Sequence, residues 1–123
     1  MASAARIMVQ KIGKVAVIDF VDSAIMDMQQ IQQITEELER IVDDQDQKFL
    51  LLDFSEVKFL SSQALGVMLK LHQKLTDKGG WLGVCGLKKE LYKIFRLTRL
   101  DRLFNFYDSE QDALRDVGVY LGG

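Results

Sequence analysis

The stretch FLLLDFSEVKFLSSQALGVMLKLHQKL, residues 49–75, decides the fold of this chain. It opens with a continuous apolar run that ends at Asp53, a pattern typical of a strand buried on both faces of a parallel sheet. From Gln63 onward, apolar residues recur at helical spacing, which predicts a helix with one face packed on that sheet. The predicted apolar face consists of Ala64, Val67, Met68, Leu71 and Leu75, widened by Leu65 and Leu69.

Two adjacent serines, Ser61 and Ser62, stand at the expected start of this helix. A serine oxygen at such a position commonly caps one of the free backbone amides of the first turn. The same amides and the helix dipole also favour a phosphate group, which would add about −1.5 to −2 charges there. On the residues alone, capping is the favoured interpretation.

The segments on either side complete an alternation of strands and helices. Residues 7–12 and 15–20 are expected to form a hairpin, and a helix capped at 21–23 is expected to end near Val42. Further strands are expected at 81–85 and 103–107, and helices at 88–97 and after 108. The first helix should bury Ile25, Met28, Ile31, Ile34, Leu38, Ile41 and Val42. This order predicts an α/β fold, with one mixed, mostly parallel sheet, an N-terminal hairpin and about four helices.

Length and composition limit the possible classes of protein. A chain of 123 residues is expected to form a single domain, residues 1–123, and its net charge of −2 argues against nucleic acid or an anionic membrane as partner. Cys85 is alone, so no intrachain disulfide is possible and a reducing compartment fits. No apolar run approaches the ~20 residues of a membrane helix, and the first residues do not resemble a secretion signal. A cytoplasmic location is therefore expected.

Residues suited to catalysis or metal binding are sparse. The sequence contains neither a Walker A motif nor a G-x-S-x-G elbow. His72 is interpreted as a packing or surface residue of the helix, and one histidine with one cysteine makes no zinc site. The acidic run at 43–47 lacks the glycine-containing calcium pattern. We therefore expect no enzymatic activity, no metal and no cofactor.

The segment LLDFSEVKFLSSQALGVML resembles the signature of the STAS domain, the family of bacterial anti-sigma factor antagonists. The rest of the chain resembles the family in its order of segments, from VAVIDF to KGGWLGVCGL and LYKIFRLTRLDRLFNFYDSEQDAL. In an alignment on 64–66, Ser62 takes the place of the serine that the family's partner kinases phosphorylate. Many members carry Asp and Gly where this chain has Ser61 and Ala64.

The resemblance implies an anti-sigma factor antagonist that acts by partner switching. Without phosphate, the domain would bind an anti-sigma factor that is itself a serine kinase. Phosphorylation of Ser62, with Ser61 as the competing site, would release that partner, and a serine phosphatase would reset the switch. The implied partner-binding residues are Asp22, Ser23, Val57, Lys58, Phe59, Leu60, Ser61, Ser62, Gln63 and Gly66.

Two other functions remain open. A non-switching STAS-like adaptor subunit of a signalling or transport assembly would account for the departures at Ser61 and Ala64. A small-ligand or nucleotide-binding domain could use the crevice at the strand ends, but the missing phosphate motifs argue against it. The basic residues from Lys88 to Arg102 fit either a solvated helix face or the steering of an acidic partner.

Overall fold

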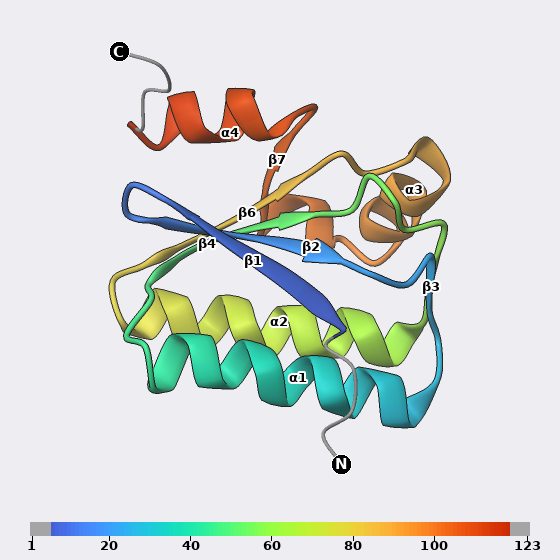
Figure 1. Ribbon diagram of the computed structural model, residues 1–123. Helices are drawn as coiled ribbons and strands as arrows, with labels where there is room; N and C mark the ends of the chain where they lie inside the picture. The colour runs from blue at the N-terminus through green and yellow to red at the C-terminus, as the bar shows by residue number, and fades with distance from the viewer. Residues whose placement is uncertain (1–5, 119–123) are drawn as a thin grey trace.

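A five-stranded sheet with the strand order β1-β2-β4-β6-β7 forms the centre of the computed structural model, which describes residues 6–118 (Figure 1). Strands β1 and β2 form an antiparallel hairpin, and the other pairs in this sheet are parallel. The strand bounds are β1 Ile7–Ile12, β2 Val15–Phe20, β4 Phe49–Asp53, β6 Trp81–Cys85 and β7 Asn105–Tyr107. This arrangement confirms the predicted mixed, mostly parallel α/β sheet.

Helices cover both faces of the sheet (Figure 1). Helices α1 (Met28–Asp43) and α2 (Ser62–Asp77) lie side by side across one face, and α4 (Glu110–Asp116) covers the other. Helix α3 (Lys89–Leu97) adds Leu91 and Phe95 to the core shared by α1 and α2, and a 3-10 turn, η1 (Leu100–Arg102), follows it. Within residues 6–118, no helix is long and apolar enough to cross a membrane.

The central strand β4 is buried on both faces, as its apolar run predicts. Leu50 and Leu52 point into the core beneath α1 and α2, whereas Leu51 points into the smaller core beneath α4. All three side chains are inaccessible to solvent. Side chains alternate between the faces of a strand, so a run without polar residues fits only a strand that is covered on both sides.

The first helix begins later than the sequence pattern indicates. The predicted caps at 21–23 are wrong, because Ala24–Ile25 forms a short strand, β3, and α1 starts at Met28. Asp27 caps α1 in a capping box with Gln30, so that the two residues satisfy each other's backbone amides. As a consequence Met28, expected in the core, is exposed.

The other expectations differ from the structure by smaller amounts. Helix α1 ends at Asp43, near Val42 as predicted, and Lys74 of α2 pairs with the Asp43 carboxylate at 2.6 Å, which offsets its repulsion by the helix dipole. In α2, Leu69 is exposed, so it does not belong to the buried face that the spacing predicts. The last strand is shorter than predicted and begins at Asn105.

Two single residues lie where the sequence predicts. His72 is half-buried and packs edge-on against Phe104, with ring centroids 5.3 Å apart. Cys85 is a free, buried cysteine at the end of β6, and burial raises the pKa of its thiol far above the usual value. Both residues are therefore packing elements of the core.

Candidate partner-binding site

A small two-stranded ribbon holds the Asp22-Ser23 loop beside the start of α2. It consists of β3 and β5 (Phe59–Leu60), which pair in parallel. The Lys58 amide donates to the Ser23 carbonyl at 2.7 Å, and the Ser61 amide donates to the Ile25 carbonyl at 3.0 Å. The two loops that leave the carboxyl ends of β2 and β4 are thus fixed together, as expected for neighbouring parallel strands.

The two serines at the start of α2 have different structural roles. Ser61 is the N-cap, and its Oγ accepts a hydrogen bond from the Ala64 amide at 3.2 Å. Ser62 is the first residue of the helix, is exposed, and its hydroxyl makes no hydrogen bond to any residue from 6 to 118. The predicted cap is therefore confirmed for Ser61, and Ser62 is left free for a reaction with another molecule.

Exposed apolar side chains lie on the ribbon that precedes this serine pair and at the start of α1. Phe59 is 60% exposed, Met26 is 53% exposed and Met28 is 69% exposed, although all three are large and apolar. Phe59 points outward because Leu60, its neighbour in the ribbon, points into the core. An open groove of about 430 Å³ is lined by Met26, Lys58, Phe59, Leu60, Lys88, Glu90, Leu91 and Ile94. Large apolar side chains gathered on a surface in this way mark contact sites for other molecules.

Some of the remaining residues predicted for partner binding are exposed, and others are buried. Ser23, Lys58, Gln63 and Gly66 are exposed. Val57 is fully buried and Leu60 nearly so. The expectation that their side chains lie on the binding surface is therefore wrong. Both side chains point into the core, whereas the neighbouring Phe59 points outward.

Asp22 is half-buried, and its carboxylate accepts hydrogen bonds from one guanidinium nitrogen of Arg6 at 3.1 and 3.2 Å. A charge held in such an ion pair is less available to a partner than a free one. Asp22 thus anchors the loop on which the exposed Ser23 lies.

A basic strip adjoins the apolar groove. The Lys88 ammonium donates to the Ser55 carbonyl and closes one side of the groove. Lys89, Lys93 and Arg96 are exposed on one side of α3 and line a second groove of about 700 Å³ beside β7. Asp108 and Asp112 also line this second groove, and Glu90 lines the apolar one, so the apolar groove keeps a small positive excess from Lys58 and Lys88.

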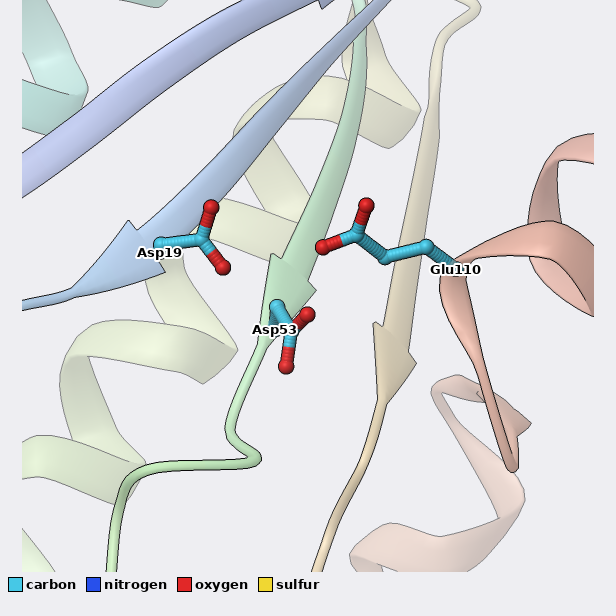
Figure 2. Close-up of side chains that lie close together, drawn as sticks. All are labelled: Asp19, Asp53 and Glu110. Atoms are coloured by element: carbon cyan, nitrogen blue, oxygen red, sulfur yellow. The ribbon is translucent and has the colours of Figure 1, made fainter.

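A cluster of three carboxylates at the strand ends was not predicted from the sequence (Figure 2). Asp19 and Asp53 lie in register on the parallel strands β2 and β4, and Glu110 reaches them from the start of α4. One carboxylate oxygen from each lies within 4.8 Å of the others. Carboxylates of this kind are ligands of hard cations, but such clusters are common without a metal, so the absence of a metal site stays a prediction.

The carboxylates of this cluster have divergent pKa values. A hydrogen bond with Asp53, together with burial, raises the pKa of Glu110 to about 7. Burial and the neighbouring Asp53 charge raise the pKa of Asp19. Burial would also raise the pKa of Asp53, but hydrogen bonds from Glu110 and Ser55 outweigh it and lower that pKa. The cluster therefore holds a proton, mainly on Glu110, up to nearly neutral pH.

This proton makes stability depend on pH. The pKa of Glu110 is higher in the folded chain than its ordinary value of 4.5, so the folded state binds more protons between pH 4.5 and about 7. The contribution of Glu110 is thus most favourable below that window and is lost as the pH rises through it. Glu110→Gln is expected to flatten the fall of the unfolding free energy between about pH 5 and pH 7 and to raise the melting temperature at pH 8.

The measurement is thermal and urea unfolding of both proteins across this pH range. Glu56→Gln is the matched control for the loss of one carboxylate, because Glu56 is exposed and lies outside the cluster. Because Glu110 is only partly buried, the effect should be smaller than its pKa shift alone implies. An unchanged slope in Glu110→Gln would show that the cluster does not hold this proton.

A model of the STAS domain family matches residues 6–113. The chain belongs to this family. The match covers the whole five-stranded sheet, the ribbon, both serines, helices α1 to α3 and the first part of α4, so the fold and the candidate site lie within the STAS domain.

Relatives at low identity include anti-sigma factor antagonists. The anti-sigma F factor antagonist of Paenibacillus polymyxa is 27% identical over 70 residues, which cover 57% of this chain and 60% of that protein. The chain thus spans about 60% of the length of the curated relatives that it matches. The crystal structure of an anti-sigma factor antagonist from Mycobacterium paratuberculosis is 28% identical, with a TM-score of 0.78 over 90% of this chain and 92% of that one.

The phosphorylated form of the Bacillus cell fate determinant SpoIIAA has the same fold. It is 16% identical, with a TM-score of 0.71 over 90% of this chain and 98% of that one. These likenesses confirm the STAS fold and a distant relationship to anti-sigma factor antagonists.

Proposed function

We propose that this STAS domain is a cytoplasmic anti-sigma factor antagonist that acts by partner switching. Without phosphate it binds an anti-sigma factor with serine kinase activity, and phosphorylation of Ser62 releases that partner. A serine phosphatase then restores the binding form. The observation that carries the proposal is the exposed hydroxyl of Ser62 at the first position of α2, which makes no hydrogen bond among residues 6–118 and follows the exposed Phe59 by three residues.

The position of Ser62 suits a phosphate in the isolated domain. Helix α2 is 16 residues long, and its N-terminus carries backbone amides and a partial positive charge. The Ser61 hydroxyl satisfies the Ala64 amide and the Ser61 carbonyl the Leu65 amide, so the amides of Ser62 and Gln63 can face an added anion. A phosphate on Ser62 is therefore compatible with the fold.

A partner packed over the same surface would not tolerate the phosphate. Contact with Phe59, Met26 and Met28 would remove water from the start of α2, and an anion enclosed in such an interface loses its hydration. Lys58 and Lys88 outnumber the one acidic residue of the groove, Glu90, which favours a partner with acidic groups around an apolar centre. Such acidic groups would add repulsion of the phosphate to the cost of its burial.

In this proposal the domain is the substrate of phosphorylation and not its catalyst. The one histidine of the chain, His72, lies ten residues after Ser62 in α2 and packs against Phe104. The Bacillus relative described in a phosphorylated form is a precedent for a phosphorylated protein with this fold. The kinase activity would come from the partner.

The test is phosphopeptide mapping after incubation of the chain with ATP and each candidate anti-sigma factor from the same organism. The label is expected on Ser62, and the chain with ATP alone is the control. Robust labelling of the chain alone would contradict the role of passive substrate.

The non-switching adaptor is the second candidate function. It is supported by Ser61, which occupies the position where many STAS domains carry Asp and here serves as a helix cap. An adaptor would bind its partner through the same apolar surface but would not be labelled by any kinase.

Phe59 is expected to be a principal contact residue in either case. Exposed aromatic side chains that become buried in an interface typically contribute about 2 kcal/mol or more on truncation. Phe59→Ala should therefore weaken partner binding at least ~10-fold while leaving the melting temperature nearly unchanged. Binding is measured by isothermal titration calorimetry.

Leu97→Ala is the control for Phe59→Ala, because Leu97 is also exposed but does not line the groove at Phe59. If both variants bind as the wild type does, the partner uses another surface.

A further inference from the structure

Strand β1 is a long, open edge of the sheet. It pairs on one side with β2 and is the first strand in the order β1-β2-β4-β6-β7. Its register with β2 is continuous over six residues and contains no bulge, and the chain contains no proline. The opposite edge, β7, is only three residues long. Proteins protect sheet edges with short strands, bulges, prolines and charges, and β1 has only Lys11 for this purpose.

The backbone of β1 alternates between groups bonded to β2 and groups that point outward. The Val21 amide donates to the Arg6 carbonyl at 3.1 Å, which places Arg6 in a hydrogen-bonded pair of the ladder. In an antiparallel ladder every second pair is of this kind, so Met8, Gln10 and Ile12 also bond to β2. The amides and carbonyls of Ile7, Val9 and Lys11 therefore face away from the sheet.

Apolar side chains lie along the same edge. Met8 is 65% exposed and Val9 is 48% exposed, and the neighbouring Gln10 and Lys11 are exposed as well. Unpaired backbone groups flanked by exposed apolar side chains form a template for another strand.

We propose that β1 pairs with β1 of a second copy of this chain, so that the two sheets join in an antiparallel, two-fold symmetric dimer. The outward-facing backbone groups of Ile7, Val9 and Lys11 determine the register. All three residues of both copies can form hydrogen bonds across the interface only if the two-fold axis passes at Val9. Val9 then pairs with Val9 of the second copy, and Ile7 pairs with Lys11. The interface is the same patch on both chains, as closed two-fold dimers require.

Charge complementarity supports a second copy as the occupant of this edge. The Arg6 amide donates to the Glu37 carboxylate at 3.3 Å, so a negative charge from α1 lies at the Ile7 end of β1. Lys11, at the other end, is exposed and makes no ion pair among residues 6–118. Lys11 and Ile7 project from the same face of β1. The proposed register therefore brings Lys11 of each copy toward Glu37 of the other.

The dimer and the proposed switch use different residues. The open edge consists of β1, whereas the apolar groove is lined by residues of β5 and α3 and by the neighbouring Met26, Lys58 and Lys88. Dimerisation would thus present two partner-binding surfaces on one continuous sheet.

The experiment measures the mass of the full chain by sedimentation equilibrium between about 1 μM and about 1 mM, which brackets a weak association. The wild type is expected to rise from 14.0 kDa toward twice that mass. Val9→Pro removes only the outward-facing amide, and proline is tolerated on an edge strand whose N–H faces solvent. It should weaken association at least ~10-fold. Val9→Thr keeps the amide and the branched side chain and is the matched control.

A second variant keeps the test decisive if Val9→Pro does not fold. Val9→Lys places like charges opposite each other at the dyad and should also abolish association. In the wild type, amide exchange at Val9 and Lys11 should slow as the concentration rises, whereas Met8 and Gln10 should be protected throughout. A mass of 14.0 kDa at every concentration, or equal association of the wild type and both disruptive variants, would overturn the proposal.

Discussion

Ser62→Asp is expected to fold like the wild type and to lose most of its affinity for the proposed anti-sigma factor partner, whereas Ser62→Ala should keep that affinity. The Ser62 side chain is exposed and makes no hydrogen bond among residues 6–118, so neither change removes a stabilising contact. A carboxylate at the start of α2 interacts favourably with the helix dipole. In a closely packed interface the same charge costs a few kcal/mol, which corresponds to about a hundredfold loss of affinity or more.

Titration calorimetry with the purified anti-sigma factor, before and after addition of ATP, measures this effect. Ser62→Ala should stay bound when ATP is added, because the acceptor hydroxyl is missing. A phosphate carries more charge than one carboxylate, so phosphorylated wild type should bind more weakly than Ser62→Asp.

Ser61→Ala is the matched control for these variants. It removes the cap on the Ala64 amide and should cost about 1 kcal/mol of stability, but it keeps the Ser62 hydroxyl, so ATP should still release the partner. Phosphate found on Ser61 alone would overturn the assignment of Ser62. Phosphate on neither serine would leave the non-switching adaptor as the better account.

The central stretch could be predicted from sequence because one structural feature dominates each part of it. A short apolar run that ends at a polar residue is typical of a strand covered on both faces, and Leu50, Leu51 and Leu52 are all inaccessible. The change to helical spacing after Ser62 then locates α2 to within one residue. These signals are local, so no knowledge of the tertiary structure was needed.

The ribbon of β3 and β5 could not be predicted in the same way. Each strand has two residues, too few for a side-chain period, and the ribbon depends on backbone hydrogen bonds such as that from Lys58 to Ser23. Its absence from the prediction placed the start of α1 too early and hid the exposure of Met26 and Met28. The pattern Asp27-x-x-Gln30 was a capping signal that could have corrected the start of the helix.

The carboxylate cluster could not be predicted from the sequence for a different reason. Asp19 and Asp53 become neighbours only through the register of β2 with β4, and Glu110 joins them from 57 residues farther along the chain than Asp53 (110 − 53). The spacing of these residues in the sequence does not indicate either contact. The exposed Ser62, by contrast, depends on local helix geometry, so that part of the candidate site could be predicted.

Leu51→Asp is expected to unfold the domain or to lower its unfolding free energy by more than about 4 kcal/mol, a large part of the 5–15 kcal/mol typical of a domain. Leu51 is inaccessible and packs with Val15, Val17, Cys85, Ala113 and Leu114 beneath α4. Two penalties add at this site. The substitution removes buried apolar contacts, and it encloses a carboxylate that has no cationic partner in this core.

The neighbours of Leu51 make the cost larger than at an average buried position. Leu51 and Asp53 point to the same face of β4, where Asp19 and Glu110 already crowd their carboxylates and Glu110 holds its proton up to about pH 7. A further carboxylate behind them would have to stay protonated as well. Leu69→Asp is the matched control, since Leu69 is exposed on α2, and it should change stability by no more than about 0.5 kcal/mol. Urea unfolding of both variants measures this difference. If Leu51→Asp unfolded at the same urea concentration as the wild type, the placement of β4 at the centre of the sheet would be contradicted, because a carboxylate is tolerated without cost only where it is solvated.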